Sequence, residues 1–211
     1  MFSKPYNAIF VHIPKTGGQS IEQVFLQMHG LTWKERSALL LGENPMGSKP
    51  RHLAHLYARE YCECGHLPQE VFDSCFKFSA VRNPYDRMFS EYRYRAHKRK
   101  TTFEEFIAAV TNARSDRHLV PQTKFLYDGM RNLIVDQIIR FENLEAEFAE
   151  ISKRLFGRAV PLPHANKSIA AAAPPLTEEL RRSIYKRYEC DFDFFQYSSG
   201  HKYVSVVAPS T

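Results

Sequence analysis

An apolar run at residues 8–13 ends abruptly in the sequence Pro-Lys-Thr-Gly-Gly. The run is rich in residues typical of a parallel strand that is buried on both faces. The next segment, residues 19–29, carries apolar residues at helical spacing, namely Ile21, Val24, Phe25 and Met28. We therefore expect a strand, a tight turn and a helix in immediate succession.

This turn has the chemistry of an anion site. Gly17 and Gly18 let the backbone turn tightly with its N–H groups outward, and the positive end of the helix dipole adds to the charge of Lys15. The expected ligand is an anion such as phosphate. A nucleoside-triphosphate P-loop places its lysine after the second glycine, whereas Lys15 precedes both glycines. Taken alone, the motif is equally compatible with an ordinary glycine turn after a strand.

A second unit of the same kind occupies residues 76–98. The strand-like sequence Phe-Lys-Phe-Ser-Ala-Val is followed by Arg82, by Asn83 as a helix cap and by Pro84 as the first helical residue. Arg82 is therefore expected at the carboxyl end of a strand, where ligands bind in open α/β sheets. Ser90, further along the helix, is expected to face the same crevice. Two such sites predict a ligand with two separated phosphate groups.

The rest of the chain continues the alternation of strands and helices. We expect a helix from about 53 to 61, a strand within 132–141, a helix over 142–156 that Gly157 ends, and a last helix that Thr177 caps. A capping box of Thr102 and Glu105 begins another helix. This order predicts an α/β fold in a single domain, residues 1–211, with a mostly parallel central sheet flanked by helices. Its core spans about 8–197, followed by a short tail, 198–211.

Composition narrows the class of protein. No apolar stretch approaches the roughly 20 residues that would cross a bilayer, and the polar first residues do not form a signal peptide. The four cysteines are too few for a disulfide framework, and Cys62-Glu-Cys64 lacks the spacing of common zinc sites. We expect reduced thiols and a cytoplasmic protein. The net charge of +6 favours an anionic partner of unspecified kind.

Two segments, HIPKTGGQSIEQ and FKFSAVRNPYDRMFSEY, resemble the sulfotransferase family that uses 3′-phosphoadenosine 5′-phosphosulfate. The resemblance is greatest to the branch of bacterial sulfotransferases and carbohydrate 2-O-sulfotransferases. It spans about residues 8–197 and continues through four further segments: 118–123 (HLVPQT), 140–144 (RFENL), 163–168 (PHANKS) and 188–197 (YECDFDFFQY).

The resemblance implies a set of residues that bind the donor. The 5′-phosphosulfate would be surrounded by Lys15, Thr16, Gly17, Gly18, Gln19 and Ser20. The 3′-phosphate would be held by Arg82 and Ser90. A later loop that contacts the donor would comprise Asn166, Lys167 and Ser168. No metal is expected, because lysine, arginine and helix dipoles supply the positive field.

The implied chemistry is in-line sulfuryl transfer to an acceptor hydroxyl. Lys15 would stabilise the charge that develops on the leaving phosphate. A histidine suits the role of base, because its unperturbed pKa lies near neutrality. The candidates are His52, in the sequence RHLAH, and His66, in the sequence CGHLP, with His55 between them. The resemblance favours His52 and leaves His66 as its rival.

The acceptor is less defined. The resemblance implies a hydroxyl on a carbohydrate or glycolipid, and no nucleic-acid module is recognisable. The basic run at residues 93–100 is either a solvated surface or a landing site for an anionic acceptor. Two other functions stay open: a nucleotide kinase-like phosphotransferase that uses ATP, and a non-catalytic basic protein that binds an anionic glycan. The sequence predicts no oligomeric state.

Overall fold

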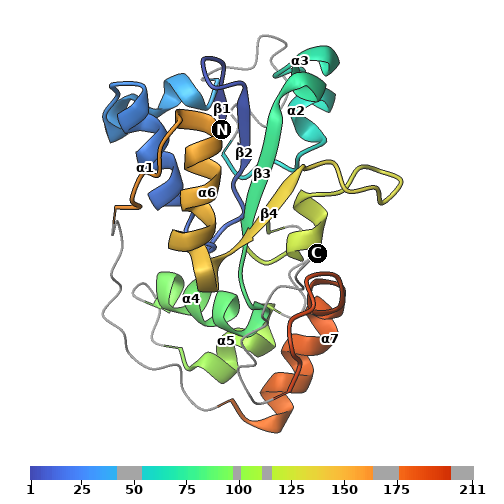
Figure 1. Ribbon diagram of the computed structural model, residues 1–211. Coiled ribbons are helices and arrows are strands. Elements are labelled where there is room, and N and C mark those ends of the chain that lie inside the picture. The colour runs from blue at the N-terminus through green and yellow to red at the C-terminus, as the bar shows by residue number, and fades with distance from the viewer. Residues whose placement is uncertain (42–53, 97–100, 111–115, 164–175, 201–211) are drawn as a thin grey trace, which may run out of the picture.

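The computed structural model describes residues 1–41, 54–96, 101–110, 116–163 and 176–200 (Figure 1). In chain order the elements are β1 (Phe2–Ser3), β2 (Ala8–Val11), α1 (Gly18–Met28), η1 (Trp33–Leu39), α2 (Glu60–Glu63), α3 (Gln69–Ser74), β3 (Phe76–Val81), α4 (Pro84–Ala96), α5 (Phe103–Val110), η2 (Gln122–Phe125), β4 (Gln137–Arg140), η3 (Phe141–Asn143), α6 (Leu144–Phe156) and α7 (Glu178–Phe194).

The strands form one sheet in the order β1-β2-β3-β4. β2, β3 and β4 are parallel, and the short β1 is antiparallel to β2. Phe10 pairs with Phe78, and Ala80 pairs with Ile139. Every residue of β2 and β3 is buried, as expected for strands covered on both faces. The prediction of an α/β fold with a mostly parallel central sheet and flanking helices is confirmed.

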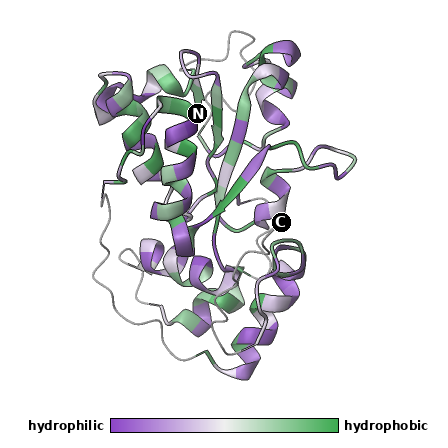
Figure 2. Ribbon diagram, viewed as in Figure 1, coloured by the Kyte–Doolittle hydropathy of each residue, from purple (hydrophilic) through white to green (hydrophobic). Residues whose placement is uncertain are grey.

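Helices lie at both ends of the sheet and alongside its strands (Figure 1). α2 and α3 lie by the amino ends of the parallel strands, and α4, α5 and α7 lie beyond the carboxyl ends. α1 and α6 pack alongside the strands, and hydrophobic residues gather on the strands and the helix faces that cover them (Figure 2). The carboxyl edge of the sheet is therefore bordered by a separate layer of helices.

This layer has its own hydrophobic core. Its buried residues come from α4, α5, α7 and the segment before η2, and they are Met88, Phe103, Phe106, Ile107, Val110, Leu119, Leu180, Ile184, Tyr188 and Phe192. The buried Tyr188 hydroxyl donates a hydrogen bond of 2.7 Å to the Leu119 carbonyl. Because this core holds α4 in place, it also fixes the side chains that α4 directs toward the sheet.

Local signals predicted several helix ends correctly. The Asn83 side chain accepts a 2.9 Å hydrogen bond from the first turn of α4. Thr102 and Glu105 form their capping box, with bonds of 2.9 and 3.2 Å. The Thr177 side chain caps α7, and Gly157 ends α6 with a φ of 72°. Each of these signals acts within one helical turn, and each is confirmed.

Two expected elements differ from the structure. The helix expected from about 53 to 61 is wrong for residues 54–59, since α2 begins only at Glu60. His55 has a φ of 56°, which a right-handed helix excludes, and the Ala58 N–H donates instead to the Phe125 carbonyl at 2.7 Å. The strand expected within 132–141 is limited to β4, because the preceding residues form a turn around Asp128.

Candidate functional site

The turn between β2 and α1 closes as the glycines predict. Lys15 and Gly17 have φ values of 71° and 84°, in the left-handed region. The buried Thr16 hydroxyl donates a 2.9 Å hydrogen bond to the Ile13 carbonyl and locks the turn. Among the described residues, no side chain caps α1 and no acidic residue lies in its first turn. The helix dipole and the first N–H groups therefore favour an anion at this end of α1.

The residues of this turn differ in exposure. Gly18 is buried, Lys15 and Ser20 are half-buried, and Gln19 is exposed. A Cβ atom on Gly18 would lie 2.2 Å from the His12 ring, which Glu22 holds through a 2.8 Å contact between its Oε1 and the imidazole Nδ1. Gly18 is thus required for close packing against His12, whereas Gly17 supplies the positive φ of the turn. The sequence predicted the turn but not this contact.

The side chain of Lys15 lies over the aromatic ring of Tyr94. Its ammonium lies 4.3 Å from the centroid of Tyr94 on α4. Burial lowers the pKa of Lys15 and the charge of Arg82 lowers it further, while Glu91 acts in the opposite direction. A partly buried ammonium beside a second cation is poised to interact strongly with an anion.

Arg82 lies directly beside the Lys15 turn. Its Nη1 is 3.4 Å from the Lys15 carbonyl oxygen, and its guanidinium lies 4.0 Å from the Phe141 ring centroid. The Arg82 backbone exchanges hydrogen bonds of 2.9 and 2.8 Å with the side chain of Gln122. The buried Asp191 carboxylate in turn accepts a hydrogen bond from the Gln122 N–H. The structure thus brings the two predicted strand-end sites together.

One face of α4 borders this site. Arg87, Ser90, Glu91 and Tyr94 are spaced so that they share it. The buried Arg87 donates hydrogen bonds of 3.0–3.1 Å to the carbonyls of Pro14, His118 and Val120, and so joins the Lys15 turn to the segment before η2. Ser90 is half-buried on the same face. Its predicted role in binding a phosphate stays a prediction.

The histidines proposed as a base lie in different places. His52 falls outside the described residues, as do Asn166, Lys167 and Ser168. His66 lies between α2 and α3, by the amino end of β3, whereas Lys15 and Arg82 are at the carboxyl edge of the sheet (Figure 1). The structure therefore does not bring His66 to the Lys15 turn.

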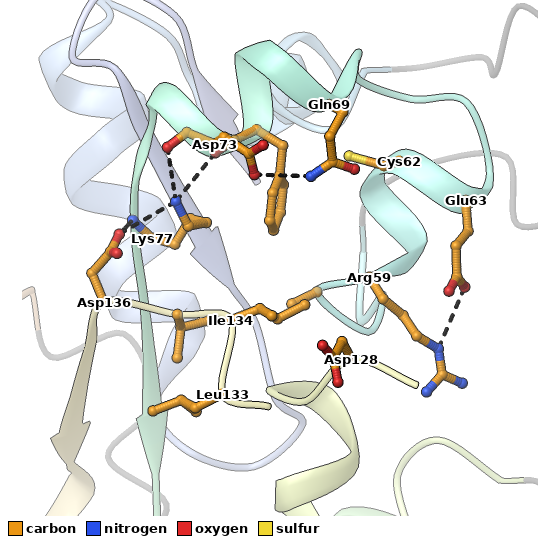
Figure 3. Close-up of a pocket in the computed structure, with 13 residues that line it drawn as sticks. Arg59, Cys62, Glu63, Gln69, Asp73, Lys77, Asp128, Leu133, Ile134 and Asp136 are labelled. Carbon is orange, nitrogen blue, oxygen red and sulfur yellow. Dashed lines mark hydrogen bonds and ion pairs between the residues drawn. The ribbon is translucent and has the colours of Figure 1, made fainter. Parts of the chain in front are cut away.

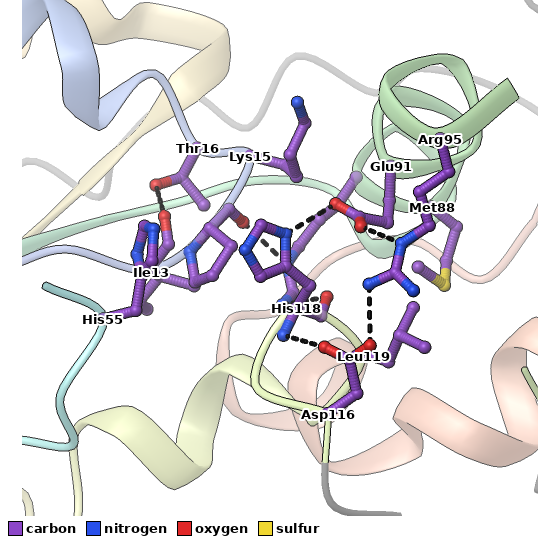
Figure 4. Close-up of polar contacts among 12 residues, drawn as sticks. Ile13, Lys15, Thr16, His55, Met88, Glu91, Arg95, Asp116, His118 and Leu119 are labelled. Atoms are coloured by element: carbon purple, nitrogen blue, oxygen red, sulfur yellow. Dashed lines mark hydrogen bonds and ion pairs between the residues drawn. The ribbon is translucent and has the colours of Figure 1, made fainter. Parts of the chain in front are cut away.

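Three other histidines, His12, His55 and His118, cluster beside this turn, and Figure 4 shows His55 and His118 near Lys15. The ring centroids of His12 and His55 are 4.5 Å apart, and those of His55 and His118 are 5.3 Å apart. His55 Nδ1 donates a 3.1 Å hydrogen bond to the His12 carbonyl, whereas His118 Nδ1 contacts the Glu91 carboxylate at 3.0 Å. Of these three, only His55 is among the candidate bases predicted from the sequence.

His55 predicts a specific pH dependence of stability. Burial, followed by the charge of His12, lowers its pKa from 6.5 to about 3. At pH 5 the native state keeps His55 neutral while the unfolded chain protonates it. This group should therefore reduce the free energy of unfolding as the pH falls from about 6.5 toward 3, by up to about 1.4 kcal/mol per pH unit. His55→Asn should remove this slope, since asparagine tolerates a positive φ.

Urea unfolding of the wild type and His55→Asn between pH 8 and pH 5 measures this contribution. Above pH 7 the difference in unfolding free energy between the two proteins should be constant, which provides the internal control. Below pH 6.5 the difference should shift in favour of the variant. Parallel curves over the whole range would contradict the pKa of His55.

Sequence reasoning assigned no role to Arg87, Glu91 or His118. The segment that contains His118 was recognised only as part of the family resemblance. Glu91 follows Arg87 by four residues on a helix, a spacing that places both on one face. This spacing was the only signal in the sequence for a shared role of Arg87 and Glu91. Their common partner is His118, which lies 31 positions from Arg87 and 27 positions from Glu91.

A cavity lies at the other end of β3, away from Lys15 and Arg82 (Figure 3). Its volume is about 420 Å³, and Lys77, at the amino end of β3, lines it. The Lys77 ammonium donates a 2.8 Å hydrogen bond to the Cys75 carbonyl and lies 3.5 Å from the Asp136 carboxylate. Arg59 is likewise paired with Glu63. These charges stabilise each other, and β3 separates the cavity from Arg82, so we do not include it in the site.

Several general features bear on the class of protein. Within the described ranges, no helix combines the length and apolarity needed to cross a bilayer. In the same ranges, no three His, Cys, Asp or Glu side chains are grouped as metal ligands. All four cysteines lie in the described part of the chain, and all are free thiols.

Fold and site together define an α/β protein with a strand–turn–helix unit and two neighbouring cationic side chains, Lys15 and Arg82, at the carboxyl edge of a mostly parallel sheet. Residues 1–198 match the model of the sulfotransferase family. The match covers nearly the whole chain, so the chain belongs to the sulfotransferase family, and the resemblance found in the sequence is confirmed. The family is one of transferase enzymes. A comparison with curated proteins finds no match.

Proposed function

We propose that this protein transfers a sulfuryl group from 3′-phosphoadenosine 5′-phosphosulfate to a hydroxyl on a carbohydrate or glycolipid. The observation that carries the proposal is the meeting of Lys15 and Arg82 at the start of α1, where Arg82 Nη1 lies 3.4 Å from the Lys15 carbonyl. Two cations and a helix N-terminus suit a ligand with two phosphate groups. Family membership supports sulfuryl transfer as the reaction.

The residues of the site fit such a donor. Lys15, Thr16, Gly17, Gly18, Gln19 and Ser20 would hold its 5′ end, and Arg82 with Ser90 its 3′-phosphate. When bound, the donor supplies the sulfuryl group. Lys15 offers a half-buried positive charge to the leaving phosphate, and such a charge stabilises the transition state more than the ground state. Asn166, Lys167 and Ser168 remain proposed donor contacts, and a cytoplasmic location remains a proposal.

Thermal unfolding with added nucleotides tests the donor. 3′-Phosphoadenosine 5′-phosphate should raise the melting temperature more than ATP with magnesium does. Arg82→Met should weaken binding of this nucleotide by about 1.5–3 kcal/mol, because a charge-assisted contact to a phosphate is lost. Arg158→Met, an exposed arginine after α6, provides the matched control and should bind like the wild type.

Transfer from radiolabelled donor to a panel of unsulfated polysaccharides and glycolipids tests the reaction. Equal or greater stabilisation by ATP would favour the kinase-like alternative and count against the proposal. Tight binding of 3′-phosphoadenosine 5′-phosphosulfate without transfer of its sulfuryl group to any acceptor or to water would favour the alternative of a non-catalytic binding protein.

A further inference from the structure

The segment before η2 brings a paired histidine to the Lys15 turn. His118 lies beside His55 and stacks on Tyr94, with ring centroids 5.9 Å apart and an interplanar angle of 18°. The same Tyr94 ring contacts the ammonium of Lys15. Lys15 and His118 therefore belong to one site, although they come from opposite halves of the chain.

A closed network of charged groups holds His118. Its Nδ1 contacts Glu91 Oε2 at 3.0 Å, and its backbone N–H donates to Asp116 Oδ1 at 2.9 Å. Arg95 bridges the two carboxylates, since it bonds both Glu91 and Asp116. Arg87 fixes the His118 carbonyl at 3.0 Å. Both ends of the residue are thus held, as expected for a group that must be preorganised.

The hydrogen-bond partner of His118 Nδ1 determines which ring nitrogen of His118 can accept a proton. Glu91 is completely buried, and burial raises its pKa, but the hydrogen bonds and charges of His118 and Arg95 outweigh this and keep the pKa below its ordinary value. The ionised carboxylate only accepts hydrogen bonds, so Nδ1 of His118 is the donor. Nε2 then carries the lone pair, and no hydrogen bond within the described residues engages it. The His118 side chain is 27% exposed to solvent.

We propose that His118 is the catalytic base of this site and that Glu91 is its positioning residue. The inference rests on the proposed sulfuryl transfer. As the acceptor oxygen forms its bond to sulfur, its O–H bond breaks and the proton moves to Nε2 of His118. The electron pair of the breaking sulfur–oxygen bond stays with the leaving phosphate beside Lys15. The proton on His118 is later released to water.

His55 suits this role less well, although it lies in the same cluster. Its Nδ1 donates to a neutral carbonyl rather than to a carboxylate, and burial and the charges of His12 and His118 disfavour its protonated form more than Glu22 favours it. Its low pKa makes it a weak proton acceptor. The Glu91 carboxylate, by contrast, stabilises the imidazolium of His118 as a proton arrives.

The first test compares His118→Ala with His29→Ala in the full-length protein. His29 follows the opposite end of α1 and bonds Ser3, so it serves as a matched histidine outside the site. His118→Ala should lower the rate of sulfuryl transfer by about 10²–10⁴. The rate is measured with radiolabelled donor and the best polysaccharide of the panel, or with water as acceptor. Stabilisation by 3′-phosphoadenosine 5′-phosphate should stay at the wild-type level, and added imidazole should restore part of the rate.

A second measurement does not depend on activity. Nuclear magnetic resonance of isotope-labelled histidine in the unliganded protein should show His118 protonated at Nδ1. Glu91→Gln should alter this tautomer and lower the transfer rate without weakening nucleotide binding. A merely structural role of Glu91 would leave the tautomer unchanged.

The outcomes separate the two proposals. If the wild type neither binds the nucleotide nor transfers sulfate, the proposed function fails and the role of His118 fails with it. If the wild type is active and His118→Ala keeps a tenth or more of the wild-type rate, only the role of His118 is refuted. A wild-type His118 protonated at Nε2 would also refute it.

Discussion

Replacing Lys15 with methionine is expected to lower the turnover of the proposed sulfuryl transfer by about 10²–10³. Methionine keeps an unbranched stem that can lie against Tyr94 and removes only the charge. Because Lys15 is half-buried, its ammonium acts in a medium less polar than water and stabilises the leaving phosphate strongly. The affinity for 3′-phosphoadenosine 5′-phosphate should change less than kcat, since Arg82 and the N-terminus of α1 still attract the nucleotide.

Steady-state transfer assays and nucleotide titrations of the same preparations measure both quantities. Lys153→Met is the matched control, because Lys153 is an exposed lysine of α6 that pairs with Glu150. Its kcat should equal that of the wild type. A Lys15→Met protein whose kcat stays within threefold of the wild type would refute the proposed role of Lys15.

Replacing Arg87 with methionine is expected to lower the free energy of unfolding by about 3–5 kcal/mol. The Arg87 side chain is 1% exposed and donates to three carbonyls, those of Pro14, His118 and Val120. Methionine fills a similar volume but leaves these acceptors without their donor. The charge of Arg87 also acts on Asp191, where burial raises the pKa and Arg87 opposes that rise.

Urea unfolding of Arg87→Met at neutral pH gives the change directly. Arg158→Met should differ from the wild type by less than about 0.5 kcal/mol, as is usual for surface substitutions. A loss below 1 kcal/mol in Arg87→Met would show that the three carbonyls find other donors. Since Arg87 joins the Lys15 turn to His118, the variant should also lose transfer activity under conditions in which it remains folded.

The fold could be predicted wherever its signals are local. The strand at residues 8–11 follows from an unbroken apolar run, and the strand at 76–81 follows from a mainly apolar run that Lys77 and Ser79 interrupt. The caps at Asn83 and Gly157 follow from interactions within one helical turn. The helix expected from about 53 to 61 was wrong for residues 54–59, because contacts between distant segments determine their conformation. Residues 54–59 have helix-compatible composition, but their backbone bonds to η2 and turns at His55, and these are tertiary contacts.

Some residues of the candidate site could be predicted from local sequence, and others could not. Lys15, its glycines and Arg82 were predictable, because a charge at the end of an apolar strand is visible in the residue order. The pairing of His118 with Glu91 was not, since the two residues are 27 positions apart and meet only when α4 packs against the segment before η2. The sequence directed attention to His52 and His66, and the fold directs it to His118.

The residue order alone was therefore sufficient for the class of fold, the family and the glycine turn between β2 and α1. Strand runs, caps and glycine turns are encoded by neighbours along the chain, where no loop must close for them to form. Packing of the α4–α5–α7 layer against the sheet was needed to bring Lys15 and His118 to the ring of Tyr94 and to pair His118 with Glu91. Such contacts depend on the closure of long loops and on side-chain shape, which no short segment of sequence specifies.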